Sequence, residues 1–212
     1  YSCGEDGSAQ LSPGFSPDKK EINVQTKRFD SKTGSGGHDA SVTAMTITGD
    51  GKYLITGSVD TTIRVWDTNT QKVIRIYTGH TATVNALAMS PDSKSFVSVG
   101  ADQSVKVWTL AVADEHENFD EHKGIVWSSS ISPDGKLIAS GGADRTVIIR
   151  EARGGKVLHR LEGHTAAITK VVFSPKGDLL ATSSGDTLVK LWNPKTGALV
   201  RDLKGATKPV MA

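Results

Sequence analysis

A step of 42 residues runs through this 212-residue chain and limits what it can fold into. Glycine stands at positions 37, 79, 163 and 205, glutamate takes the corresponding position 121, and histidine follows at 38, 80, 122 and 164. An aspartate lies 22 residues beyond each of the positions 38, 80, 122 and 164, and three of these aspartates are followed six residues later by tryptophan. Landmarks that keep one register through four units predict an array of repeats, each of them one structural unit.

The pattern of each unit predicts four short strands separated by turn residues. In the first unit the run Val42 to Ile47 is apolar at alternate positions, and glycine and aspartate at 49–51 form a turn. The runs KYLITG, TIRVW and KVIRIY follow, rich in β-branched and aromatic residues. The unit therefore predicts a four-stranded antiparallel sheet, whose faces must be covered by the neighbouring units.

A Gly-His start, a Trp-Asp end and a period of about 40 to 45 residues are typical of one family. Through Gly79-His80, Trp66-Asp67 and their counterparts the chain resembles the WD-repeat family. The resemblance implies an all-β fold, a β-propeller built of four-stranded WD-repeat blades. The predicted divisions are a partial blade with a 12-residue insertion and an outer strand at 1–36, WD repeats at 37–78, 79–120, 121–162 and 163–204, and the start of a further blade at 205–212.

Four full repeats with partial ones at both ends allow two interpretations. Because seven blades are usual in the resembled family, the resemblance implies a segment of a larger, seven-bladed propeller. The alternative is a ring of five blades, closed where the two ends combine into one sheet.

Composition excludes some classes of function. The formal net charge of +2 gives no overall attraction to nucleic acid or to an anionic membrane. A single cysteine, Cys3, cannot form an internal disulfide, which favours a reducing, intracellular location. No apolar run approaches 18 residues, and the sequence shows neither a membrane span nor a secretory leader.

Each unit also contains a histidine, a serine or threonine and an aspartate, as a nucleophilic triad does. A catalytic set is needed once, whereas this one is repeated in every unit, so no catalytic residue is predicted. The resemblance instead implies buried hydrogen-bond networks that hold each blade together. The implied networks are His38-Asp60-Thr56-Trp66, His80-Asp102-Ser98-Trp108, His122-Asp144-Ser140 without a tryptophan, and His164-Asp186-Thr182-Trp192.

Arg150 stands where the third network should have its tryptophan. The guanidinium either donates to the network in place of the indole or extends outwards to solvent. The two other histidines, His116 and His159, have no partner at metal-ligand spacing, and no phosphate-binding glycine loop precedes a helix. No metal and no cofactor is therefore predicted.

The resemblance places a partner-binding surface at the end of the propeller that carries the aspartate turns. Most positions expected to be exposed there hold small side chains, but Ile125 and Trp127 are large and apolar, and Trp127 is the only tryptophan outside the repeat column. They anchor a partner, or else Trp127 fills the central channel or packs under a loop. Further candidates for protein binding are Asn85, Thr43 and Thr169, and an acidic strip with Asp114, Glu115 and Glu117, which is otherwise a solvated outer edge.

These features predict a non-catalytic scaffold that binds proteins or peptides within an intracellular multiprotein assembly. One alternative is an accessory subunit of a ribonucleoprotein that binds RNA, although direct nucleic-acid binding would need a basic stripe with aromatic residues, and the lysines are scattered. The other alternative is a hydrolase built on a propeller frame, with a metal or carboxylates in the central channel, and clustered inward-facing carboxylates would favour it.

Overall fold

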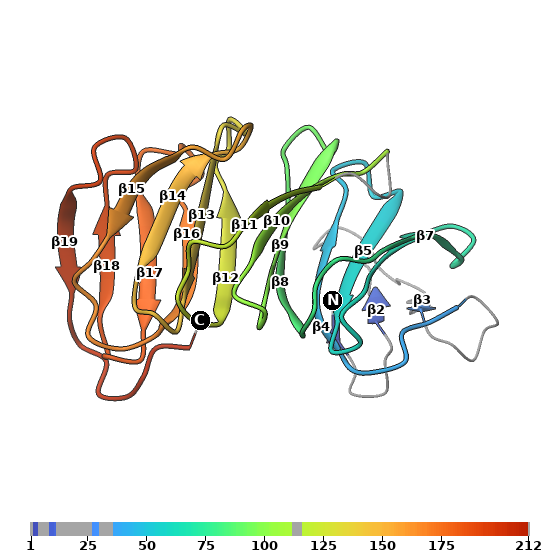
Figure 1. The fold of residues 1–212 in the computed structure, drawn as a ribbon, viewed down its shortest axis with the longest axis horizontal. Coiled ribbons are helices and arrows are strands. Elements are labelled where there is room, and N and C mark those ends of the chain that lie inside the picture. The colour runs from blue at the N-terminus through green and yellow to red at the C-terminus, as the bar shows by residue number, and fades with distance from the viewer. Residues whose placement is uncertain (1, 4–8, 12–26, 30–35, 112–115, 212) are drawn as a thin grey trace, which may run out of the picture.

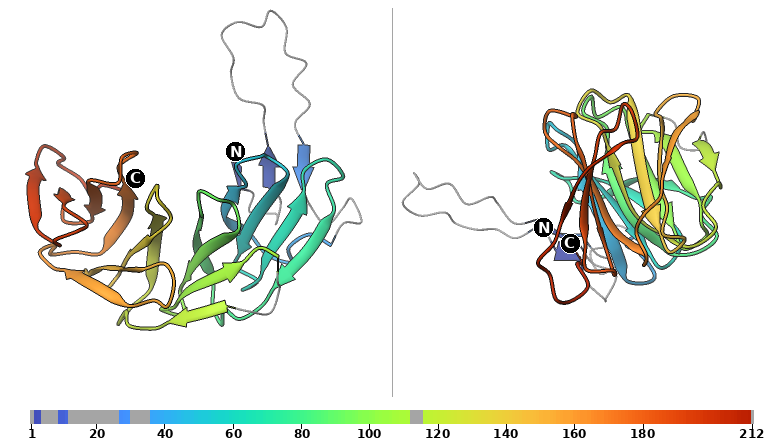
Figure 2. Two further views of the ribbon diagram at one scale, coloured as in Figure 1. Left: turned by 90° about the horizontal axis from the view of Figure 1, so that it is seen from above. Right: turned by 90° about the vertical axis from the view of Figure 1, so that its left-hand side faces the viewer.

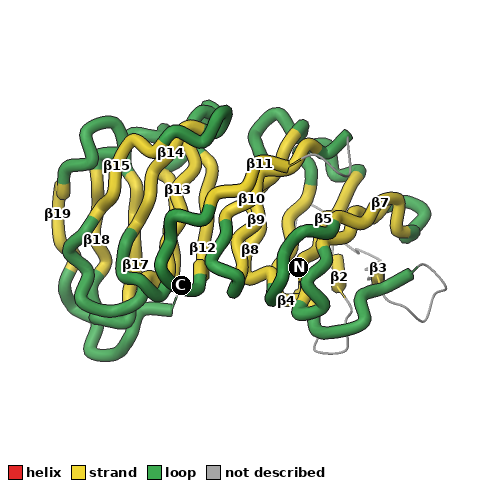
Figure 3. Tube along the Cα trace, in the orientation of Figure 1, coloured by secondary structure: helices red, strands yellow, loops and turns green. Residues whose placement is uncertain are grey.

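The computed structural model describes residues 2–3, 9–11, 27–29, 36–111 and 116–211. The described residues form strands, turns and loops without a helix (Figure 3). Blade 1 contains β4 Val42–Ile47, β5 Tyr53–Ser58, β6 Ile63–Asp67 and β7 Val73–Tyr77. Blade 2 contains β8 Val84–Met89, β9 Ser95–Gly100, β10 Val105–Thr109 and β11 His116–Phe119.

The second half of the chain repeats this arrangement. Blade 3 contains β12 Val126–Ile131, β13 Leu137–Gly142, β14 Val147–Glu151 and β15 Val157–Leu161. Blade 4 contains β16 Ile168–Phe173, β17 Leu180–Ser184, β18 Val189–Trp192 and β19 Leu199–Leu203. Near the N-terminus, β1 Ser2–Cys3, β2 Ala9–Leu11 and β3 Lys27–Phe29 form a three-stranded sheet. Of the outer strand predicted there, only β3 lies in the described residues, and the predicted insertion lies outside them.

Every blade is an antiparallel meander in which strands adjacent in sequence are hydrogen-bonded neighbours (Figure 1). The four blades stand side by side along an arc whose two ends do not meet (Figure 2). The first strands of successive blades, β4, β8, β12 and β16, contact one another. The predicted all-β fold of four-stranded blades is confirmed.

The hydrophobic core lies between the blades. One cluster joins blades 1 and 2 and includes Ile55, Val65, Val84 and Trp108. A second joins blades 2 and 3, and a third joins blades 3 and 4. Because each sheet is only one layer thick, burial of its apolar faces depends on the next blade, which explains why the sequence has one period and one core pattern throughout.

The described end of the acidic strip of blade 2 forms an outer strand, although acidic residues are poor strand formers. β11 is four residues long and pairs with β10 along its whole length. His116 stacks on Trp108 with ring centroids 4.4 Å apart. This aromatic contact and the backbone ladder together hold β11 on the sheet.

Candidate functional site

The repeated polar residues of blade 1 meet in one buried chain of hydrogen bonds. His38 Nδ1 lies 2.9 Å from Asp60 Oδ2, and His38 Nε2 lies 2.8 Å from Thr56 Oγ1. Trp66 Nε1 donates to the same hydroxyl oxygen at 2.8 Å. Since the carboxylate can only accept, one proton order satisfies all groups: indole to hydroxyl, hydroxyl to Nε2, and Nδ1 to carboxylate.

Two other blades repeat this chain of bonds. In blade 2 the His80–Asp102, His80–Ser98 and Trp108–Ser98 distances are 2.8, 2.6 and 2.7 Å. In blade 4 the corresponding distances, among His164, Asp186, Thr182 and Trp192, are 2.8, 2.9 and 2.9 Å. The structure thus brings together each complete set that the sequence suggested.

The network of blade 1 lowers the pKa of its carboxyl group. Burial alone, the largest effect, would raise the pKa of Asp60, but hydrogen bonds from the side chain and backbone of Thr62 and from His38 hold it at about 2. Burial lowers the pKa of His38, against the opposing effect of Asp60. At neutral pH the pair is therefore an ionised carboxylate and a neutral imidazole, as the proton order above requires.

The hydroxyls of the networks are not placed for nucleophilic chemistry. Thr56, Ser98 and Ser140 are completely buried and Thr182 is 1% exposed, so a substrate cannot reach their oxygen atoms. Each hydroxyl lies between an imidazole and, in three blades, an indole. Buried polar groups that find all their partners in this way rigidify a sheet.

Blade 3 is built differently where the sequence places Arg150. His122 bonds Asp144 at 2.8 Å and Ser140 at 2.9 Å, but no indole donates to Ser140. Arg150 neither replaces that donor nor extends to solvent: its side chain is completely buried, and its Nη2 donates to Glu121 Oε2 at 2.7 Å. Both outcomes expected from the sequence are therefore wrong at this position.

The aromatic ring of Phe119, on blade 2, lies against this guanidinium. The Arg150 Cζ atom lies 4.5 Å from the ring centroid, a cation–π distance. Gly155, with φ +62°, makes room for the ring, because a Cβ atom there would lie 1.8 Å from Phe119 Cε1. Arg150 thus pairs with the glutamate of its own unit and contacts blade 2 through the aromatic ring of Phe119.

Blade 2 offers a steric explanation for the occurrence of the glutamate and the arginine in one blade, whereas in blade 4 a Cβ atom added to Gly163 would keep an ordinary 3.8 Å from Trp192 Cη2. In blade 2 a Cβ atom added to Gly79 would lie 3.2 Å from Trp108 Cη2, so the glycine lies against the edge of the indole. Blade 3 has no indole at this place, and Glu121 fills the free space with a carboxylate that reaches Arg150. In the sequence the signal was visible as two departures from the columns in a single unit, Glu121 for glycine and Arg150 for tryptophan.

A β-bulge interrupts the pairing of the first two strands in every blade, at positions 43, 85, 127 and 169. A bulge redirects the side chain of the extra residue. The Thr43 hydroxyl donates to the carbonyl of Val84, and the Thr169 hydroxyl to the carbonyl of Val210. Asn85 Nδ2 donates to the carbonyl of Val126 at 2.9 Å. In three blades the bulged residue therefore clamps its blade to the segment that follows.

Trp127 occupies the bulge of blade 3 without making this clamp. No bond from its indole to β16 is found among the described residues, and its side chain is 44% exposed. Two serines of β12 accept hydrogen bonds from the backbone of blade 4 instead. Ser128 Oγ accepts from Val171 N at 3.2 Å, and Ser130 Oγ accepts from Phe173 N at 3.3 Å. Blades 3 and 4 are therefore joined by hydrogen bonds that do not involve the side chain of Trp127.

Ile125 lies two residues before Trp127, at the turn end of blade 3, and is partly buried. Its carbonyl accepts from Ala143 N at 2.8 Å, which fixes it against the aspartate turn. Gly142 permits this approach, because a Cβ atom there would lie 2.2 Å from the Ile125 oxygen. The backbone of Ile125 is thus fixed two residues before the bulge that carries Trp127.

The remaining predicted residues are less informative. Asp114 and Glu115 lie outside the described residues. Glu117 is exposed on β11. Within the described ranges no three His, Cys, Asp or Glu side chains gather closely enough to hold a metal ion. The same part of the chain contains no helix that is long and apolar enough to cross a membrane.

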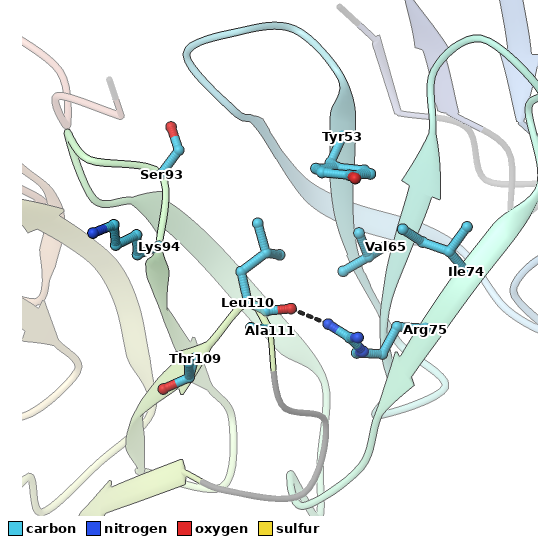
Figure 4. Close-up of a pocket in the computed structure, with 9 residues that line it drawn as sticks. All are labelled: Tyr53, Val65, Ile74, Arg75, Ser93, Lys94, Thr109, Leu110 and Ala111. Carbon is cyan, nitrogen blue, oxygen red and sulfur yellow. Dashed lines mark hydrogen bonds between the residues drawn. The ribbon is translucent and has the colours of Figure 1, made fainter.

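A cavity of about 510 Å³ opens at the outer side of the junction between blades 1 and 2 (Figure 4). Its lining is largely apolar and includes Tyr53, Val65, Ile74 and Leu110. The guanidinium of Arg75 donates to the Leu110 carbonyl at its wall. The described lining contains neither a histidine nor a carboxylate, so it offers no general base.

Successive four-stranded antiparallel meanders that stack along an arc, each with a buried His–Asp–Ser/Thr network, define a protein of the β-propeller repeat class. The family described as WD40, WD domain, G-beta repeat, matches residues 30–67, 71–109, 115–150 and 155–193, which together are more than half of the chain. The chain belongs to this WD40 family. A comparison with curated proteins finds no match. WD40 repeats generally mediate interactions between proteins, and proteins built from them are typically non-enzymatic scaffolds that often act inside the cell.

Proposed function

We propose that this chain is a non-catalytic scaffold that holds protein partners in a multiprotein assembly inside the cell, and that Trp127 with Ile125 anchors one partner on blade 3. The observation that carries the proposal is the difference between the side chain at the bulge of blade 3 and those at the bulges of the other three blades. Three blades use the bulged side chain to clamp the next segment, whereas blade 3 places an indole there, 44% exposed.

Energetics support an anchor at this place. A tryptophan that becomes buried at the centre of an interface contributes about 2 kcal/mol or more to binding. A side chain on a strand, next to a backbone fixed by hydrogen bonds, loses little conformational freedom when a partner covers it. The fixed backbone of Ile125 and the position of Trp127 on β12 meet this condition.

The test is affinity capture from native extract with the full chain and with the variants Trp127→Ala and Ile125→Ser. Ile76→Ala is the matched control, because Ile76 on β7 is also 44% exposed but lies on an outer strand of blade 1. Circular dichroism first establishes that all three variants are folded. We expect at least one protein to be lost with the blade 3 variants and retained with Ile76→Ala.

Two results would contradict the proposal. If the captured proteins are the same for all variants, Trp127 has no role as an anchor. If the control variant loses the same proteins as Trp127→Ala, the losses reflect a general effect of exposed apolar residues rather than a site on blade 3.

A further inference from the structure

We infer that the Trp127 surface selects acidic peptide segments, through Lys123 and Arg145 on the two turns beside it. This inference rests on the proposed function and adds the chemistry of the partner. Two positions at the turn end of each blade distinguish blade 3 from the others. The position after each network histidine and the position after each network aspartate are both exposed or half-buried there.

Blade 3 alone has cations at these positions. The residue after the histidine is Asp39, Thr81, Lys123 or Thr165. The residue after the aspartate is Thr61, Gln103, Arg145 or Thr187. Two positive charges therefore gather on the blade that also carries the exposed indole, and the equivalent positions of the other three blades are neutral or acidic.

The two turns of blade 3 are held together by their backbones. Lys123 N donates to Asp144 Oδ2 at 3.0 Å, and Arg145 directly follows this aspartate. Ala143 N donates to the Ile125 carbonyl at 2.8 Å. Both cations thus lie on the turns that flank Ile125, at the same end of the blade.

The two nearby carboxylates, Asp144 and Glu121, are bonded to other side chains. Asp144 is engaged by the His122 imidazole at 2.8 Å, and Glu121 by the Arg150 guanidinium at 2.7 Å. In the described part of the chain neither Lys123 nor Arg145 forms an ion pair, and both side chains are exposed. A partner carboxylate can therefore pair with either cation without displacing an existing partner.

The arrangement favours a peptide over nucleic acid. Binding of a phosphate backbone uses a series of cations along a groove and gives a steep dependence on salt. Here two cations flank one apolar pair, and the equivalent positions on the adjacent blades 2 and 4 are threonine or glutamine. This pattern complements a short segment with one large apolar side chain and acidic neighbours.

The experiment selects random dodecapeptides displayed on phage with the full chain, with the double variant Lys123→Glu/Arg145→Glu, and with Trp127→Ala. Lys176→Glu, in an exposed turn of blade 4, is the control for a change of charge. The most enriched peptide is synthesised and its Kd is measured by fluorescence anisotropy. A pool of random single-stranded RNA is measured in parallel.

We expect the unchanged chain and Lys176→Glu to enrich Asp and Glu around an apolar residue, and the double variant to enrich Lys and Arg. The Kd of the synthetic peptide should rise about 10-fold or more in the double variant and should also rise with salt. Selection without an acidic bias, or no selection at all, overturns the inference. Tighter binding of the RNA pool, lost in the same variants, also overturns it.

Failure of the inference is distinct from failure of the proposed function. If Trp127→Ala abolishes peptide binding while the double charge variant keeps the same peptides, the role of Trp127 as an anchor is supported and only the selection of acidic peptides is refuted. If Trp127→Ala selects the same peptides as the unchanged chain, with the same Kd, the anchor itself is refuted.

Discussion

The pair of Glu121 and Arg150 should behave as one unit in stability measurements. Glu121→Gly removes the only anionic partner that the structure gives to a completely buried guanidinium. Leaving a buried charge without its partner costs about 3–5 kcal/mol, and because the glutamate side chain is 32% exposed, water can reach the vacated place, so we expect about 3 kcal/mol. Glu121→Gln, which retains an acceptor, should cost about 1–2 kcal/mol.

Arg150→Trp should also destabilise the chain, for a different reason. An indole would need the space that Glu121 occupies, as the contact between Gly79 and Trp108 in blade 2 shows. Crowding of this kind costs about 1–3 kcal/mol. The double variant Glu121→Gly/Arg150→Trp restores the pair found in blade 2, so its free energy of unfolding should lie within about 1 kcal/mol of the unchanged chain.

The assay is equilibrium unfolding in urea followed by far-ultraviolet circular dichroism, since a new tryptophan would disturb a fluorescence signal. The four proteins form a double-mutant cycle. The reasoning is refuted if the two single losses add up to the loss of the double variant within about 0.5 kcal/mol. It is also refuted if Glu121→Gly alone leaves the unfolding midpoint unchanged.

Three other measurements address the networks and the turn of blade 3. The depressed pKa values of His38, ordinarily 6.5, and of Asp60, ordinarily 3.8 and here about 2, mean that the unfolded chain binds more protons than the folded one. Stability should therefore fall as the pH drops below 6.5 and fall further between 3.8 and about 2, and a melting temperature that stays constant over these windows would contradict this account. Ser98→Ala should cost about 1 kcal/mol more than Ser140→Ala, because only Ser98 also accepts from an indole; equal losses in urea unfolding would count against the proton order. Gly142→Ala would place a Cβ atom 2.2 Å from a backbone oxygen and should lower stability by about 3 kcal/mol or more, so an unchanged thermal transition would show that the turn can shift.

The fold could be predicted from the sequence because its determinants are local and repeated. Apolar alternation at Val42 to Ile47, turn residues and a constant step of 42 residues gave the strands and their order. The network partners could be predicted as well, through the resemblance to the WD-repeat family, because each unit has these residue types at the same spacing. A repeated pattern averages out the uncertainty of any single strand, and this is why the four blades were predictable as a set.

The contacts of individual side chains could not be predicted in the same way. Arg150 had two expected environments, and the structure gives it a third, since that choice depends on the distance to Glu121 and on a ring from the adjacent blade. The clamps of Thr43, Asn85 and Thr169 depend on bulges, which one sequence column does not reveal. These three residues were expected only as exposed polar positions for a partner, whereas their donors bond neighbouring backbone carbonyls.

Chains made of near-identical units can assemble out of order while they fold, because any one sheet can dock on any other. Phe119, Arg150 and Gly155 make the junction of blades 2 and 3 unlike its neighbours: the ring covers the guanidinium and fills the space left by the glycine. A sheet docked there without the ring would leave the cation poorly covered. The departures of blade 3 from the repeat therefore favour its docking on blade 2 over docking on another blade.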